Sequence, residues 1–288
     1  MTPTPAAEVD GDVHVHPAYL AGAHWAGDAA FHPLLGLGAH THHDDLGNYF
    51  AATPDGRIRL GFIPEQDWDT LWQLAVAPRP FAAPAWVASF SEDTPTEIVT
   101  AVTTELAAMY RPDEDAWLTA RRPGILESMA PYTAQGWTVR PTSRGELVAA
   151  APDGHAEASY SHQPLDRNEA EQAGQDGRYT LSAGGPQEGW YGRFSSGTPA
   201  RILDAAATAM LTPTPAVRYR GCLTPYARRN ATITPITPPT PSPLDVHRAL
   251  AARTRSVPRI VQSAPPERAP AATLAWSTST PTTAPGRR

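Results

Sequence analysis

The sequence contains no lysine: all 23 of its basic residues are arginine, against 29 acidic residues in 288. With so much Ala, Pro and Gly, this composition is typical of a GC-rich genome, so arginine in place of lysine does not indicate phosphate recognition. The single cysteine, Cys222, excludes an intrachain disulfide and favours a reducing compartment. No apolar run approaches the roughly 18 residues of a membrane helix, and the start resembles no secretory signal. We therefore expect a cytoplasmic protein without a membrane partner.

Acidic residues are nearly absent from the last quarter of the chain. Residues 212–288 hold 11 arginines against Asp245 and Glu267, whereas residues 1–211 hold 12 arginines against 27 acidic residues. The same last stretch holds 14 of the 32 prolines. Such a composition buries too little apolar surface to offset chain entropy. The sequence predicts a Pro/Arg-rich, mostly disordered tail over 216–288, and a disordered N-terminus over 1–10.

The acidic body contains an internal repeat. "NYFAATPDGRIRLGF" (48–62) resembles "ELVAAAPDGHAEASY" (146–160), and "AWVASFSEDTPTEIVTAVTTEL" (85–106) resembles "GWYGRFSSGTPARILDAAATAM" (189–210). The two blocks occur in the same order and are offset by 98 and 104 residues. They indicate a duplication, with a first repeat domain over 11–112 and a second over 113–215.

Each copy has the pattern of a small α+β unit. Pro-Asp-Gly at 54–56 and 152–154 separates alternating apolar runs, which predicts two β-hairpin turns. Two further strands follow in each copy, ending at "WVASF" and "WYGRF". The fold class is therefore α+β, two tandem repeats that are each an antiparallel β-sheet with a helix packed on one face.

A helix is expected directly after the last strand of each copy. Thr94 and Thr198 are the expected N-caps, with a proline after each, and Glu97 would complete a capping box in the first copy. Apolar residues then recur at helical spacing. An earlier helix is expected around "GILESMAPYTAQGW", shortened or kinked by Pro131, with a weaker counterpart at "FHPLLGLGAH".

These segments carry a family resemblance. "DVHVHPAYLAG" (12–22), the "TPDGRIRLGFIP" hairpin, "QGWTVRP" (135–141) and "GWYGRFSSGTPARIL" resemble the actinobacterial domain-of-unknown-function 317 family, which often occurs as tandem copies. The second copy departs from the pattern, because "HAEASYSHQP" replaces the arginine-rich hairpin arm and Gly192 interrupts the aromatic strand. The resemblance implies the fold and the domain limits, and it supplies no catalytic residues.

Histidines and aspartates cluster in "HTHHDD" (40–45). His40, His42 and Asp44 match most of the metallo-β-lactamase pattern His-x-His-x-Asp-His, but Asp45 stands where the last histidine should be. A similar Asp-x-His-x-His pattern at 12–16 belongs in a barrel of about 250 residues, longer than the body. We interpret residues 40–45 as a polar loop that binds Zn or Ni adventitiously at most, and we expect no cofactor.

Three functions remain open. Neither copy shows a convergent acid–base set, which favours a non-catalytic binding protein rather than an enzyme, with a groove between the copies as its natural site. Aromatic side chains of such strands pack in a core more often than they face a ligand. Trp72, Trp86 and Trp190 are the candidates that could face a ligand here. The first alternative is binding of nucleic acid or another acidic partner through tail arginines, and the second is a metal-dependent hydrolase using residues 40–45. The candidate tail contacts are Arg228, Arg229, Arg253, Arg255 and Arg259.

Overall fold

The computed structural model describes residues 11–236, apart from 24–27, 65–69, 113, 116, 119–120, 167–173, 175 and 186–187. The predicted disordered segments 1–10 and 237–288 lie outside the described residues. The fold is α+β with antiparallel sheets, as the sequence predicted. No helix in the described part of the chain is long and apolar enough to cross a membrane.

Both copies repeat the same order of elements around a strand-rich core. The first copy consists of α1 (Asp28–Leu35), β2 (His40–His43), β3 (Tyr49–Ala52), β4 (Ile58–Phe62), β5 (Thr70–Val76), β6 (Trp86–Ser91) and α2 (Thr96–Met109). The second consists of α3 (Ile125–Ala134), β7 (Thr138–Pro141), β8 (Glu146–Ala150), β9 (Ala156–Ser161), β10 (Tyr179–Ala183), β11 (Trp190–Phe194) and α4 (Ala200–Met210). The predicted strands and both predicted helices of each copy are confirmed.

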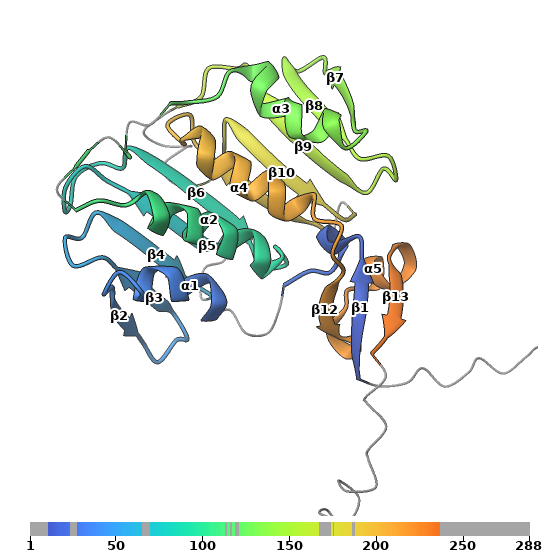
Figure 1. Ribbon diagram of the computed structural model, residues 1–288, viewed down its shortest axis with the longest axis horizontal. Coiled ribbons are helices and arrows are strands. Elements are labelled where there is room, and N and C mark those ends of the chain that lie inside the picture. Colours follow the sequence, from blue (N-terminus) through green and yellow to red (C-terminus); the bar gives the residue numbers. More distant parts are fainter. Residues whose placement is uncertain are drawn as a thin grey trace, which may run out of the picture. The chain divides into compact units, whose positions relative to one another are not determined.

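The ten strands form one continuous sheet in the order β2-β3-β4-β5-β6-β11-β10-β9-β8-β7. This order reads the same from either edge, so the last strands of the two copies, β6 and β11, meet at the centre. Figure 1 shows four helices of the two copies in a row over one face of this sheet, in the order α1, α2, α4 and α3. The alternating strand β5 buries Trp72, Leu74 and Val76 beneath them. The two copies therefore share one core.

The Pro-Asp-Gly turns have the predicted form. Gly56 and Gly154 have positive φ angles of 65° and 73°, which an L side chain rarely adopts. The Gly56 N–H donates to the Thr53 carbonyl at 2.7 Å, and the Gly154 N–H donates to the Ala151 carbonyl at 2.9 Å. Local turn chemistry thus fixes the β3–β4 and β8–β9 hairpins.

The junction of β6 and β11 is two-fold symmetric in its register. Phe90 lies opposite Gly192, Ala88 lies opposite Phe194, and Ser89 faces Arg193. At the 104-residue offset, Phe90 corresponds to Phe194 and Ala88 to Gly192. A Cβ on Gly192 would lie 2.9 Å from the Phe90 ring, closer than packing allows. Gly192 is thus the residue that lets the two central strands approach each other.

Two serines at equivalent positions of the copies form hydrogen bonds across this junction. Ser91 Oγ accepts a hydrogen bond from the Tyr191 N–H at 2.8 Å, and Ser195 Oγ accepts one from the Val87 N–H at 3.0 Å. Both serines are buried. Each copy thus uses the serine that follows the phenylalanine of its central strand to accept a hydrogen bond from a backbone N–H of the other copy.

The predicted capping of α2 is wrong. The helix begins at Thr96 after Pro95, without a side-chain cap. Thr94 Oγ1 instead donates to the Tyr191 carbonyl at 3.0 Å across the junction. The Glu97 carboxylate pairs with Arg218 rather than closing a capping box. Tertiary partners have displaced the local ones, and the N-cap of α4 is likewise Pro199 rather than Thr198.

The predicted start of disorder at residue 216 is also wrong. β12 (Ala216–Tyr219) and β13 (Thr232–Pro235) flank β1 (Asp12–His16) in a second, three-stranded sheet. Between them lie a 3₁₀ turn η2 (Arg220–Cys222) and the helix α5 (Pro225–Asn230). This small sheet buries Val13 and Val15 of β1. The ordered body therefore reaches residue 236, and β1 lies outside the sheet of the first repeat.

The segments that precede the two copies are exchanged. Tyr19, in the 3₁₀ turn η1 (Ala18–Leu20), donates its hydroxyl to Asp153 Oδ2 at 2.5 Å, and its carbonyl accepts from Trp190 Nε1 at 2.7 Å. Trp117 lies 98 residues after Tyr19, and its ring lies under the Arg57 guanidinium at 5.0 Å. The segment before the first copy thus packs on the second, and the reverse. The two copies are interlocked.

Candidate functional site: the groove between α2 and α4

A groove of about 800 Å³ runs between α2 and α4. Its apolar floor comes from Ile98, Ala101, Ala205, Ala209 and Met210. Residues Ala18 and Tyr19 of η1, with Thr214–Ala216 before and at the start of β12, close one end. The groove is therefore built from both copies and from the small sheet.

The groove straddles the pseudo-two-fold relation between the copies. Ala101 and Ala205 are equivalent at the 104-residue offset, and so are Thr104 and Thr208; all four line the groove. Small side chains on two neighbouring helices leave room between the helix axes, which is the physical origin of the groove. The central lining is thus the same in both copies.

The rim of the groove carries asymmetric charge. Equivalent positions hold Glu97 in the first copy and Arg201 in the second. Arg201 Nη2 pairs with Glu105 Oε1 at 2.5 Å. The guanidinium of Arg218, which is only 3% exposed, binds both Glu97 oxygens at 2.7 Å and donates to the Gly22 carbonyl. This ion pair fixes the first turn of α2 to the small sheet.

Asp204 is the remaining carboxylate of the groove. Burial raises its pKa above the ordinary aspartate value, the negative charges of Glu127 and Glu105 raise it further, and the positive charge of Arg121 opposes them. The structure gives Asp204 no ion pair among the described residues. A cation placed in the groove would therefore relieve unfavourable electrostatics at this carboxylate.

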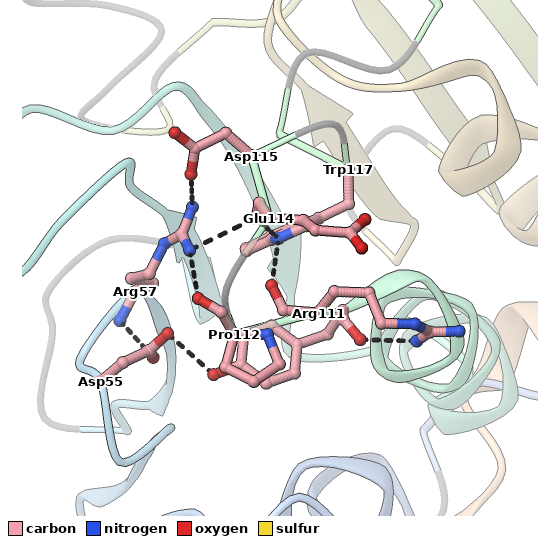
Figure 2. A network of polar contacts seen from close by, with 8 residues as sticks. Asp55, Arg57, Arg111, Pro112, Glu114, Asp115 and Trp117 are labelled. Carbon is pink, nitrogen blue, oxygen red and sulfur yellow. Dashed lines mark hydrogen bonds and ion pairs between the residues drawn. The ribbon is translucent and has the colours of Figure 1, made fainter.

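A second polar cluster surrounds Arg57, which is 6% exposed. Figure 2 shows its guanidinium reaching Asp115 and the backbone carbonyls of Pro112 and Glu114. Trp117 Nε1 donates to the Glu114 carbonyl at 2.8 Å. Most of these acceptors are backbone atoms of the segment that joins the two copies, so the cluster fixes that segment on the first hairpin.

Asp55 of the first turn joins the same cluster. It accepts hydrogen bonds from Thr53 Oγ1 at 2.6 Å and from the Tyr110 hydroxyl at 2.7 Å. Burial alone would raise the pKa of Asp55, but these hydrogen bonds and Arg57 lower it. Burial, followed by the bond to Asp55, raises the pKa of Tyr110 to about 12. Tyr19, from the segment before the first copy, forms a similar tyrosine–aspartate pair with Asp153 of the second copy, and burial raises the Tyr19 pKa.

The predicted metal residues lie on the edge strand β2 and in the turn after it. His40 and His42 are exposed and lie opposite Ala52 and Phe50 of β3. Asp44 is occupied by the turn, because its oxygens accept from the Leu46 and Asn48 N–H groups and from the Asn48 amide, which lowers its pKa. Within the described ranges, no three His, Cys, Asp or Glu side chains are grouped as a metal would require. The predicted loop is thus partly a strand.

The three tryptophans named as candidates to face a ligand lie in the core. Trp72 is 3% exposed, Trp86 1% and Trp190 4%. They occupy the strand faces beneath the helices, where burial of large aromatic area outweighs any gain from exposure. The prediction that they face a ligand is wrong.

Two of the candidate tail arginines belong to α5. Arg228 donates to the carbonyls of Leu223, Arg220 and Gly221, and Arg229 pairs with Glu188 at 3.3 Å. Both are therefore engaged within the chain. Arg253, Arg255 and Arg259 lie outside the described residues.

The sequence patterns did not predict a structural role for Arg57 or Arg218, nor the residues that line the groove. Arginine is rarely buried, so a single sequence gives no reason to place two of them inside. The exchange of Tyr19 and Trp117 did leave a signal, because the two aromatics are separated by the same 98 residues as the hairpin block.

The fold and the groove define a class: a pseudo-symmetric α+β protein whose two copies share one sheet and form one groove. Residues 52–112 and 150–216 match the family described as SPDY, Domain of unknown function (DUF317). The chain thus carries two tandem copies of this domain. No curated protein and no solved structure gives a significant match. Each family match begins just before a Pro-Asp-Gly turn and extends past a groove helix.

Proposed function

We propose that the chain is a non-catalytic binding protein that captures a partner in the groove between α2 and α4. The observation that carries this proposal is the position of the groove on the pseudo-two-fold relation, where the duplication creates a surface that neither copy has alone. Small, half-buried alanines line its centre, and charged groups stand at its rim. An apolar strip with a polar rim is typical of recognition surfaces.

The chemistry of the lining supports binding over catalysis. Among the described residues that line the groove there is no histidine, cysteine or serine. Its hydroxyls belong to threonines and to Tyr19, whose hydroxyl donates to Asp153. Two of its three carboxylates, Glu97 and Glu105, pair with arginines. Such a set positions a partner and offers no nucleophile next to a base.

The alternative of nucleic-acid binding has less support, since two of its five candidate arginines, Arg228 and Arg229, are engaged within the body. Its other candidates, Arg253, Arg255 and Arg259, lie outside the described residues. The lone exposed cysteine fits a reducing compartment. A cytoplasmic location is part of the same proposal.

Selection from a displayed library of random peptides against the full-length chain tests the proposal. Ala101→Trp fills the centre of the groove, and Ala108→Trp places the same bulk on an exposed position of α2 outside it. We expect selected peptides to bind the wild-type chain and Ala108→Trp equally and to lose binding to Ala101→Trp. Peptides that bind all three chains alike would place recognition elsewhere and contradict the proposal. Far-ultraviolet circular dichroism verifies that both variants are folded.

A further inference from the structure

The groove carries more acid than base. Glu97, Glu105 and Asp204 line it, against the single guanidinium of Arg201. Arg201 is held by Glu105, and Arg218 neutralises Glu97 from the side of the small sheet. Asp204 has no ion pair among the described residues, and of the charges that act on it Glu127 and Glu105 are negative and Arg121 is positive. The charge that complements this rim is positive.

The shape of the groove fits a helix. It runs between two neighbouring helices, and the shorter of them, α4, has 11 residues, which corresponds to a length of about 16 Å. Ala101, Ala205 and Ala209 keep its floor low, so that a third helix can lie along it. A small molecule would be poorly enclosed in an open groove of this length, because small-molecule sites bury most of their ligand.

We propose that the groove binds a basic amphipathic helix of a partner protein. An apolar stripe of that helix, with residues at i, i+3, i+4 and i+7, lies on the alanine floor. Arginine or lysine residues beside the stripe reach Asp204 and Glu105. This inference rests on the proposed function and names the partner that the groove takes.

Divergence between the copies gives the groove a direction. Asp204 is equivalent to Thr100, and Glu105 is equivalent to Ala209, at the 104-residue offset. A fully symmetric groove would accept a helix in two opposite orientations. Because the acidic residues differ between the two sides, one orientation places the basic residues of the helix against carboxylates, and the other does not.

A displayed library of helical peptides, with the apolar stripe fixed and the flanking positions randomised, tests this inference on the full-length chain. We expect Arg and Lys to be enriched over Asp and Glu at the flanking positions. Asp204→Asn should weaken binding of the selected peptides about two- to fivefold, the range of one partly exposed ion pair. Arg201→Gln should strengthen binding, because it frees Glu105. Glu157→Gln, on the exposed side of β9, is the matched control and should change nothing.

Enrichment of acidic flanks, or equal binding to wild type and Asp204→Asn, would overturn the inference. Groove-dependent peptides without basic residues would overturn it while leaving the proposed function intact. If no selected peptide bound the wild-type chain more tightly than Ala101→Trp, both this inference and the proposed function would be overturned. Sedimentation equilibrium of the wild-type chain and Ala101→Trp adds one outcome: a dimer that Ala101→Trp dissociates would identify a second copy as the occupant and reject the partner helix.

Discussion

At the scale of the residue, two buried arginines hold distant segments of the chain together, a role that apolar side chains usually have. Arg57 ties the segment between the copies to the first hairpin, and Arg218 ties β12 to the first turn of α2. Both donate to backbone carbonyls as well as to a carboxylate, and of the polar atoms of these two side chains only the Nε of Arg57 is buried without a hydrogen-bond partner. Hydrogen bonds and ion pairs within the protein, rather than water, stabilise the charge of these two side chains.

Arg57→Ala should lower the free energy of unfolding by about 2 kcal/mol, because it leaves the partly buried Pro112 carbonyl without its donor and removes the contact with the Trp117 ring. Urea unfolding monitored by tryptophan fluorescence measures the change. Arg140→Ala, at an exposed ion pair with Glu157 of 3.7 Å, should cost less than about 0.5 kcal/mol. Equal costs for the two variants would contradict the structural role of Arg57.

Tyr110→Phe should alter the pH dependence of stability. The folded pKa of Tyr110, about 12, lies above its ordinary value of 10.0. Its favourable contribution is therefore complete below pH 10 and is lost as the pH rises toward 12. We expect the wild-type chain to lose more stability than Tyr110→Phe between pH 10 and 12. At pH 7 the variant should be less stable by about 1 kcal/mol.

Urea midpoints at pH 7, 10 and 11.5, roughly spanning the titration of Tyr110, give this comparison. Parallel losses of stability in the two chains would show that the hydroxyl of Tyr110 has no raised pKa. The carboxyl of Asp55 acts in the opposite sense: its lowered pKa contributes stability above the ordinary aspartate value, and that contribution is lost on acidification.

At the scale of the element, local sequence signals predicted what local forces determine. The Pro-Asp-Gly turns fixed two hairpins, and alternating apolar residues identified β5, β6, β10 and β11. The pairing of β6 with β11 was out of reach, because it depends on Gly192 and on two serines that contact residues about 100 positions away. β12 and β13 were missed for a similar reason: each has four residues in a proline-rich stretch and exists only by pairing with β1.

The candidate site was predicted in outline and not in its residues. Duplication alone indicates a groove between the copies, and the structure has one. Its lining could not be inferred, because alanines and threonines carry no chemical signature, whereas tryptophans do and were chosen instead. Trp86 and Trp190 lie on the core face of the strands, which periodicity specifies only once the covered face is known.

Ser91→Ala and Ser195→Ala should each lower the free energy of unfolding by about 1–3 kcal/mol, because each leaves a buried backbone N–H without an acceptor. The pseudo-symmetry of the junction predicts similar costs for the two variants. Ser128→Ala, which removes a hydroxyl bonded to the Ile125 carbonyl on α3, leaves no donor unpaired and should cost less. Chemical denaturation of the three variants decides; a cost confined to one copy would contradict a symmetric junction.

At the scale of the whole molecule, interlocking makes the ordered body indivisible. The segment with Tyr19 packs on the second copy, and the segment with Trp117 packs on the first. The chain after α4 returns to pair with β1. The ten-stranded sheet, the segments that hold Tyr19 and Trp117, and the small sheet should therefore unfold together.

The melting temperatures of truncated chains test whether these parts unfold together. A chain that ends at residue 237 should keep the melting temperature of the full-length chain, since β12, α5 and β13 remain. A chain that ends at residue 215 removes both partners of β1 and the Arg218–Glu97 pair, and should melt at least about 10 °C lower or fail to fold. Differential scanning calorimetry compares the three chains. Equal melting temperatures would show that residues 216–236 are dispensable for the body.

The most direct test of the groove as a binding surface is a nuclear magnetic resonance titration of the ¹⁵N-labelled full-length chain with a peptide selected against it. We expect amide shift changes concentrated on α2 and α4, at Ala101, Thr104, Ala205 and Thr208, and no changes at the β2 edge around His40 and His42. Shift changes centred on β2, or on the outer face of α3, with the groove helices unaffected, would contradict it.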